Sequence, residues 1–162
     1  MSYTHYWKIP KYPLPKKQWT AAVKDFRELT DVFHGTLRSH LIAWEETDPD
    51  KPPEVTNNLI RFNGIGEKGH ETFYFSRTKE EDSPVWFCKT ARKPYDALVV
   101  AALCILKKHF GNRIRVSSDG DWKTEWLNGA WEGTQSGVAL VKTYLRYSDE
   151  DLAKIAADIA RR

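Results

Sequence analysis

Hydrophobic residues recur three or four positions apart between residues 17 and 33, and this spacing predicts an amphipathic helix. The apolar positions are Trp19, Val23, Phe26, Leu29 and either Val32 or Phe33. The residues before this segment include Pro10, Pro13 and Pro15, which exclude a helix there. We therefore expect residues 1–16 to form an extended or irregular N-terminal arm.

Short apolar and alternating runs predict a sheet in the middle of the chain. The clearest alternation of polar and apolar residues covers positions 72–76, where Phe73 and Phe75 alternate with Thr72, Tyr74 and Ser76. Turn-linked neighbours of this length are typical of antiparallel hairpins, so we expect the last two strands before residue 90 to pair. The expected strands cover residues 41–44, 58–62, 71–76, 85–89 and 113–116, with turns at 48–53 and 82–84.

A second helix is expected to open at Pro94, since proline suits the first helical position. Asp96 lies in the first turn, where a carboxylate complements the helix dipole. The segment from Tyr95 to Phe110 is apolar on nearly every side, which is typical of a buried central helix. Gly111 and Asn112 should end it.

The rest of the chain predicts two further helices, one over residues 138–147 and one over 148–162. Ser148 is a good cap for the last helix, and three acidic residues follow it. The fold class is α+β. We expect a small mixed sheet of about four or five strands, a buried central helix and flanking helices at both ends, in one domain over residues 1–162.

The segment of strand 85–89, helix and strand 113–116 has the length of a strand–helix–strand crossover. Such a crossover makes its two strands parallel, so their carboxyl ends lie at one edge of the sheet. The loop before Glu71 should reach that edge as well. Polar side chains would then gather beside the start of the central helix, a favoured place for ligands in α/β sheets.

The residue types at that edge favour an anion. A helix start offers unpaired N–H groups and a partial positive charge, and basic and hydroxyl side chains surround it. Arg92 is suited to clamping a phosphate or carboxylate. The equally simple alternative is a solvated basic turn. The candidate ligand-binding residues are Lys89, Thr90, Arg92, Lys93, Ser117, Ser118, Asp119, His70, Asn63, Tyr6 and Trp7.

Composition narrows the classes of function. Hydrophobic residues make up 41% and charged residues 29%, and the net charge is +3, which is too mild for a protein that coats DNA. Nucleic acid is therefore a disfavoured but open partner. Cys88 and Cys104 do not have a metal-ligand spacing, and we expect no metal and no cofactor. No segment resembles a signal peptide or membrane span, so we expect a cytoplasmic location, with a homo-oligomer left open.

Two local patterns carry weaker functional signals. Gly64-x-Gly66-x-x-Gly69 matches the dinucleotide-binding string, but a strand follows it where a helix is required. His34-Gly35-Thr36 and His70-Glu71-Thr72 are two His-x-Thr units, a pairing found on strands in two-histidine phosphoesterases. Here His34 falls at the end of a helix, so structural roles are favoured for both patterns.

Several strings together resemble a family of small uncharacterised bacterial and phage proteins. They are Tyr3-Thr4-His5-Tyr6-Trp7, Phe87-Cys88-Lys89-Thr90-Ala91-Arg92-Lys93-Pro94-Tyr95-Asp96 and Ser117-Ser118-Asp119-Gly120. The resemblance covers roughly residues 1–122 and implies which residues matter, but no activity. The Trp-rich segment after Trp122 departs from it.

Three hypotheses of function remain. The first is binding or sequestration of a small anionic, nucleotide-like ligand, as in a phage-encoded accessory or counter-defence protein. The second is an enzyme acting on a nucleotide or phosphoester, with His70 as acid or base, Glu71 or Asp119 orienting it and Arg92 stabilising the developing charge. The third is a protein-interaction module that uses exposed tryptophans, namely Trp122, Trp126 and Trp131. Whether the protein is an enzyme is undecided by the sequence.

Overall fold

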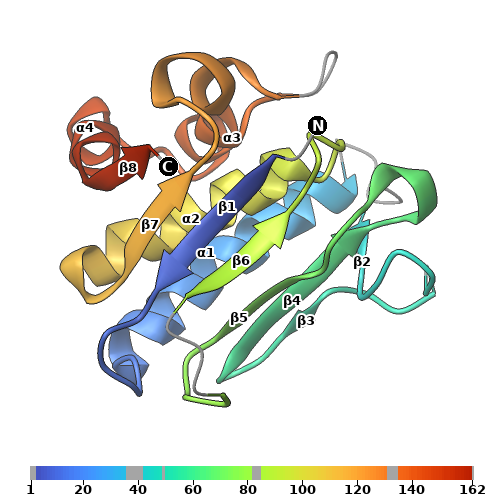
Figure 1. Ribbon diagram of the computed structural model, residues 1–162, viewed down its shortest axis with the longest axis horizontal. Helices are drawn as coiled ribbons and strands as arrows, with labels where there is room; N and C mark the ends of the chain where they lie inside the picture. The colour runs from blue at the N-terminus through green and yellow to red at the C-terminus, as the bar shows by residue number, and fades with distance from the viewer. Residues whose placement is uncertain (1–2, 36–41, 49, 82–84, 131–134, 162) are drawn as a thin grey trace.

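The computed structural model describes residues 3–35, 42–48, 50–81, 85–130 and 135–161 (Figure 1). Leu41, the turn at 82–84 and Trp131 lie outside these ranges. The elements are β1 (Thr4–Lys8), α1 (Lys16–Gly35), β2 (Ile42–Ala43), β3 (Glu54–Val55), β4 (Leu59–Gly64), η2 (Gly66–Lys68), β5 (Phe73–Ser76), β6 (Trp86–Lys89), α2 (Asp96–Phe110), η3 (Gly111–Arg113), β7 (Arg115–Ser118), η4 (Trp122–Trp126), α3 (Gly137–Tyr144), α4 (Asp149–Asp158) and β8 (Ile159–Arg161). The α+β class expected from the sequence is confirmed.

The first sheet has the strand order β6-β1-β7-β8 (Figure 1). β1 is antiparallel to both β6 and β7, and β8 is parallel to β7. β6 and β7 are therefore parallel to each other, as the crossover through α2 predicts, but β1 lies between them. This arrangement is a split β-α-β unit.

The central position of β1 corrects the expectation of an N-terminal arm. The prolines at 10, 13 and 15 follow this strand, so they exclude a helix without preventing Thr4–Lys8 from pairing on both sides. Tyr3, His5 and Trp7 point inward and are 0–2% exposed. Tyr6 and Lys8 alternate with them on the outer face, as the two-residue period of a strand requires.

The second sheet is built around β4, which pairs with β5 on one side and with β3 and β2 on the other. The expected hairpin between β5 and β6 is wrong, because β6 forms its ladder with β1. Near one end the two sheets are joined by a backbone hydrogen bond, in which Glu71 N–H donates to the Lys89 carbonyl at 3.1 Å. That contact still brings the start of β5 to the end of β6.

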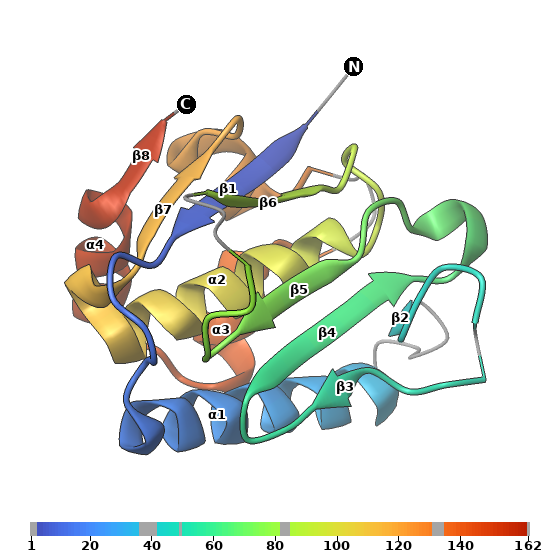
Figure 2. The same cartoon turned by 60° about the horizontal axis from the view of Figure 1, so that its bottom comes forward.

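Helices α1 and α2 lie on one face of the sheets (Figure 2). Every residue of α2 from Asp96 to Lys107 is buried, because the sheet covers one side and α1 and α3 cover the others. A Cβ atom at Gly137, at the start of α3, would come within 2.5 Å of Val100, which shows how closely α3 packs. Gly111 ends α2 with a φ of 54°, as predicted for a glycine in this position.

The last helix begins as predicted but ends early. Ser148 and Asp151 form a reciprocal capping box at the start of α4. The expectation that the helix reaches residue 162 is wrong, because the chain turns into β8 and covers the edge of β7, with Ile159 beside Val116. No helix in the described ranges has the length and apolar character needed to cross a membrane.

Candidate functional site

The polar segments expected at one edge of the sheet do meet there. Lys89 at the end of β6 pairs with Thr4, and Ser118 at the end of β7 pairs with His5. Asp119 N–H donates to the Thr4 carbonyl at 3.0 Å, and Thr4 N–H donates to the Asp119 carboxylate at 3.0 Å. The start of β1 therefore joins the ends of the two crossover strands.

Directly beneath this edge lies a buried chain of side-chain hydrogen bonds. His5 Nδ1 is 2.8 Å from Ser118 Oγ, and His5 Nε2 is 2.7 Å from Asp96 Oδ1. Thr90 Oγ1 donates to the same Asp96 oxygen at 2.5 Å. All four residues are at most 3% exposed. The chain therefore fastens β1 to β7 and to the first turn of α2.

The positions of the protons in this chain follow from the bonds around Ser118. Its hydroxyl oxygen accepts from Gly120 N–H at 2.9 Å and from Trp126 Nε1–H at 3.2 Å, which uses both lone pairs. The Ser118 O–H must then donate to His5 Nδ1, so the His5 Nε2–H donates to Asp96. The Ser-His-Asp order is that of acyl hydrolases, but the Ser118 hydroxyl is 0% exposed and makes three hydrogen bonds, so its role is structural.

The predicted phosphate clamp, Arg92, is engaged by other parts of the protein. Its Nε and Nη2 atoms lie 3.0 and 2.9 Å from Glu125 Oε2, and its guanidinium stacks 4.3 Å from the centre of the Tyr3 ring. Ala91 and Arg92 both have left-handed backbone conformations, with φ of 51° and 58°. This turn holds Arg92 over Tyr3, where Glu125 already neutralises its charge.

The loop before β5 is organised by Asn63. Its amide donates to the His70 carbonyl and to Thr72, and its oxygen accepts from the N–H groups of Gly64 and His70. Asn63 is 1% exposed, so its role is to close the loop. The Gly-x-Gly-x-x-Gly string forms this loop and the short helix η2, followed by β5, so it does not open a helix as the dinucleotide fingerprint does.

His70 is exposed beside an open hollow of about 580 Å³. Lys93 lines the same hollow, as do Glu46 and Glu67, so its charges are mixed. Glu71, expected to orient His70, instead accepts from Lys89 N–H at 2.8 Å. The two-histidine arrangement is not formed on strands, since His34 belongs to α1 and His70 to a loop, while Thr36 lies outside the described ranges.

The outer face of the first sheet carries the remaining candidate residues. Tyr6 on β1 is the register partner of Phe87 on β6 and of Ser117 on β7. Phe87 is 57% exposed. In the described part of the chain no helix lies over this face, which is turned toward the viewer in Figure 1 and lies away from the helices in Figure 2.

Three cations surround this aromatic pair. Lys89 lies on β6, Lys8 on β1 and Arg115 on β7, with Lys8 and Arg115 as register partners. Within the described ranges none of the three takes part in an ion pair. Asp119, beyond β7, accepts a weak hydrogen bond from the Tyr6 hydroxyl at 3.5 Å. We call this surface, made of Lys8, Tyr6, Phe87, Lys89, Arg115, Ser117 and Asp119, the open face.

Trp7 was expected beside Tyr6 in the ligand site, but it belongs to the core. It is 2% exposed, and its ring centre lies 5.1 Å from Phe73 and 5.6 Å from Phe75. Adjacent residues of a strand point to opposite faces, so Tyr6 and Trp7 cannot form one platform. The exposed partner of Tyr6 is Phe87, from another strand.

The tryptophans after β7 do not form the flat patch of an interaction module in the described residues. Trp126 is 0% exposed, and half-buried Trp122 stacks against it at 5.7 Å. Cys88 and Cys104 are buried, and burial raises the pKa of both thiols, which keeps them protonated. The described ranges hold no cluster of three His, Cys, Asp or Glu side chains arranged for a metal.

Five residues of the open face or the buried chain were not among the candidate site residues predicted from the sequence, namely His5, Asp96, Phe87, Lys8 and Arg115. A two-residue alternation from Tyr3 to Lys8 was the available signal for the first strand. Comparison with protein-family models, with curated proteins and with solved structures gave no match to this chain.

Proposed function

We propose that the protein binds a small anionic, nucleotide-like ligand on the open face of its first sheet. The observation that carries this proposal is the Tyr6–Phe87 pair on adjacent strands, set among three cations that have no ion-pair partner among the residues that the structure describes. An exposed aromatic ring on a sheet offers a stacking surface for a base, whatever its identity. The cations offer charge for the phosphates.

The polar residues of the open face suit the remaining groups of such a ligand. Ser117 presents a hydroxyl next to Tyr6, and Asp119 presents a carboxylate close to the Tyr6 hydroxyl. A carboxylate accepts hydrogen bonds from a ribose hydroxyl or an amino group of a base. Of the candidate residues from the sequence, Tyr6, Lys89, Ser117 and Asp119 thus belong to one surface.

Binding is favoured over turnover by the way the candidate catalytic groups are used. The enzyme hypothesis assigns His70 an orienting carboxylate and a charge-stabilising Arg92. Glu71 is bonded to the Lys89 backbone and Arg92 to Glu125. Both partners of His70 are therefore committed to holding the fold.

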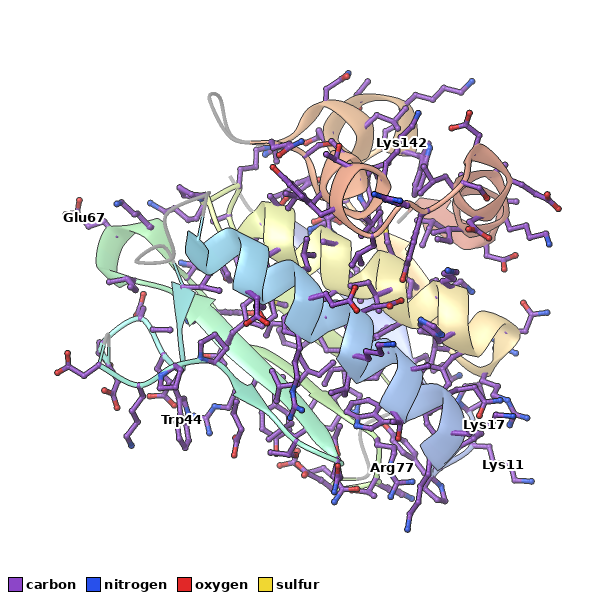
Figure 3. The ribbon with its side chains drawn as sticks, turned by 180° about the vertical axis from the view of Figure 1, so that it is seen from behind. Lys11, Lys17, Trp44, Glu67, Arg77 and Lys142 are labelled. Atoms are coloured by element: carbon purple, nitrogen blue, oxygen red, sulfur yellow. The ribbon has the colours of Figure 1, made fainter. Side chains whose placement is uncertain are left out.

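The test is a titration with nucleoside mono-, di- and triphosphates. Binding is measured by the change in tryptophan fluorescence and by the shift in the thermal unfolding temperature. We expect saturable binding that is weakened about tenfold by Phe87→Ala, since one base–aromatic stack contributes roughly 1–3 kcal/mol. Lys89→Ala should weaken binding, whereas Lys142→Ala is the matched control, because Lys142 extends from α3 on the helical side (Figure 3). Failure of every nucleotide to bind, or equal binding by Phe87→Ala, would overturn the proposal.

A further inference from the structure

The open face extends beyond the size of one nucleotide along β1. Its outward positions are Thr4, Tyr6 and Lys8, which span roughly 14 Å at about 3.4 Å per residue. Lys89 lies beside Thr4 at one end, and Arg115 lies beside Lys8 at the other. The aromatic pair therefore has a basic side chain on both sides along the strand direction, and at the Lys89 end the Asp119 carboxylate also lies beside Thr4, from whose N–H it accepts a hydrogen bond at 3.0 Å.

This distribution of charge distinguishes two kinds of nucleotide. A free mononucleotide carries its phosphates on one side of the base and can use only one of the two cationic ends. A nucleotide inside a strand has a phosphate before it and another after it. The order cation, aromatic pair, cation along the open face matches the second case.

The aromatic pair also selects unpaired bases. A ring on an open sheet stacks against the face of a base, and the faces of bases in a duplex are already covered by their neighbours. Shape recognition of a duplex depends instead on long basic surfaces that follow the backbone. The three cations and two aromatic rings form a short surface, which suits a short single strand with unpaired bases better than a duplex.

We infer that the physiological ligand class of the open face is single-stranded nucleic acid, an inference that rests on the proposed nucleotide-binding function. Phe87 and Tyr6 stack with successive bases. Lys89 contacts the backbone at one end, and Lys8 and Arg115 contact it at the other. The mild net charge of +3 argues only against coating of DNA, because a short strand needs only the local cations Lys8, Lys89 and Arg115.

The experiment measures fluorescence anisotropy of labelled eight-nucleotide DNA and RNA strands, of a duplex of the same sequence and of a competing mononucleotide. We expect either single strand to bind more tightly than the mononucleotide by tenfold or more, and more tightly than the duplex. The logarithm of the association constant should fall with the logarithm of salt concentration with a slope of about −2, as expected for three backbone contacts. Comparison of DNA with RNA identifies which strand is preferred.

Four variants test whether the strand binds at the open face and not at another surface. Phe87→Ala should weaken strand binding about tenfold at every salt concentration. Lys8→Ala and Arg115→Ala, both at exposed positions, should each reduce the salt slope by about 0.7. Lys142→Ala should change neither quantity. Thermal unfolding of each variant verifies that it is folded.

The outcomes distinguish the inference from the proposal beneath it. If the mononucleotide binds with the same affinity as the single strand, or if the duplex binds most tightly, the open face binds nucleotides but the inference of a single-stranded ligand is wrong. If neither mononucleotide nor strand binds, both are wrong. If strands bind but Phe87→Ala and the two cation variants bind equally well, the open face is not the site, which also overturns the inference.

Discussion

The Nδ1 atom of His5 lies 2.8 Å from the hydroxyl oxygen of Ser118, although 113 residues separate the two in sequence. The neighbouring residue, Ser117, points to the opposite face of the same strand. Adjacent serines therefore perform different tasks. Ser118 holds the fold together from inside, and Ser117 contributes to the open face.

The first prediction compares these two serines. Ser118→Ala leaves His5, the Gly120 N–H and the Trp126 indole N–H without a buried partner, so it should lower the free energy of unfolding by about 2 kcal/mol. Ser117→Ala should change it by less than about 0.5 kcal/mol. Urea denaturation measures both. Equal midpoints for the two variants would show that the buried chain does not stabilise the protein.

A second prediction concerns the turn before α2. Ala91 has a φ of 51°, which costs an L-residue roughly 1 kcal/mol and costs glycine almost nothing. Ala91→Gly should therefore raise the free energy of unfolding by up to about 1 kcal/mol. Ala153→Gly, at an exposed position inside α4, is the control and should lower it by a similar amount. Destabilisation by both substitutions would contradict the strained conformation.

The third prediction tests why a glycine follows Asp119. A Cβ atom at position 120 would lie 2.0 Å from the hydroxyl oxygen of Tyr3. Gly120→Ala should thus destabilise the protein by about 1–3 kcal/mol. That hydroxyl has no hydrogen-bond partner in the described part of the chain, so Tyr3→Phe alone should be nearly neutral. The double variant should recover part of the loss in thermal unfolding, and additive losses would exclude the clash as the cause.

The fourth prediction concerns acid stability. Asp25 on α1 lies 2.7 Å from His109 Nε2 and accepts from the Tyr147 hydroxyl at 2.6 Å. Burial raises the pKa of Asp25, but these two hydrogen bonds and the nearby charges of His109 and Lys108 lower it further than burial raises it. The net pKa of Asp25 in the folded protein lies below its ordinary value.

A lowered folded-state pKa means that the folded state favours the carboxylate. This contribution to stability is fully present above about pH 4, the unfolded-state pKa, and is lost as the pH falls through the lower folded-state value. Asp25→Asn should flatten the fall in stability between roughly pH 4 and pH 2 in denaturant titrations. Asp31→Asn, at an exposed position of the same helix, should retain the steep fall. If the free energy of unfolding of Asp25→Asn falls as steeply with acid as that of the original protein, other carboxylates are responsible for the acid sensitivity.

Local patterns predicted the helices well because capping and apolar spacing act within a few residues. The cap at Ser148, the end at Gly111 and the apolar length of α2 all depend on neighbours in sequence. The crossover also predicted correctly that β6 and β7 are parallel. Long-range pairing was not predicted, because nothing local to Thr4–Lys8 indicates that it inserts between two strands whose paired residues are 79 or more positions away.

The candidate site was also predicted only as far as local sequence patterns allow. The sequence predicts which residues lie at this edge of the sheet, but it does not assign them to a face. Thr90 and Ser118 are buried and bond Asp96 and His5, whereas Lys89 and Ser117 lie on the outer face, and the members of each inner and outer pair differ by one position. Register decides which side a residue takes, and the register of β1 was not predictable before its partners were known.

The insertion of β1 between β6 and β7 also constrains how the molecule assembles. Its partners lie late in the chain, and sheets dominated by such distant pairs fold slowly. The open face does not exist in any partly folded state that lacks one of the three strands. A ligand that bridges all three therefore recognises only the completed fold, and its binding adds to the free energy of unfolding in proportion to the logarithm of its concentration once the site is saturated.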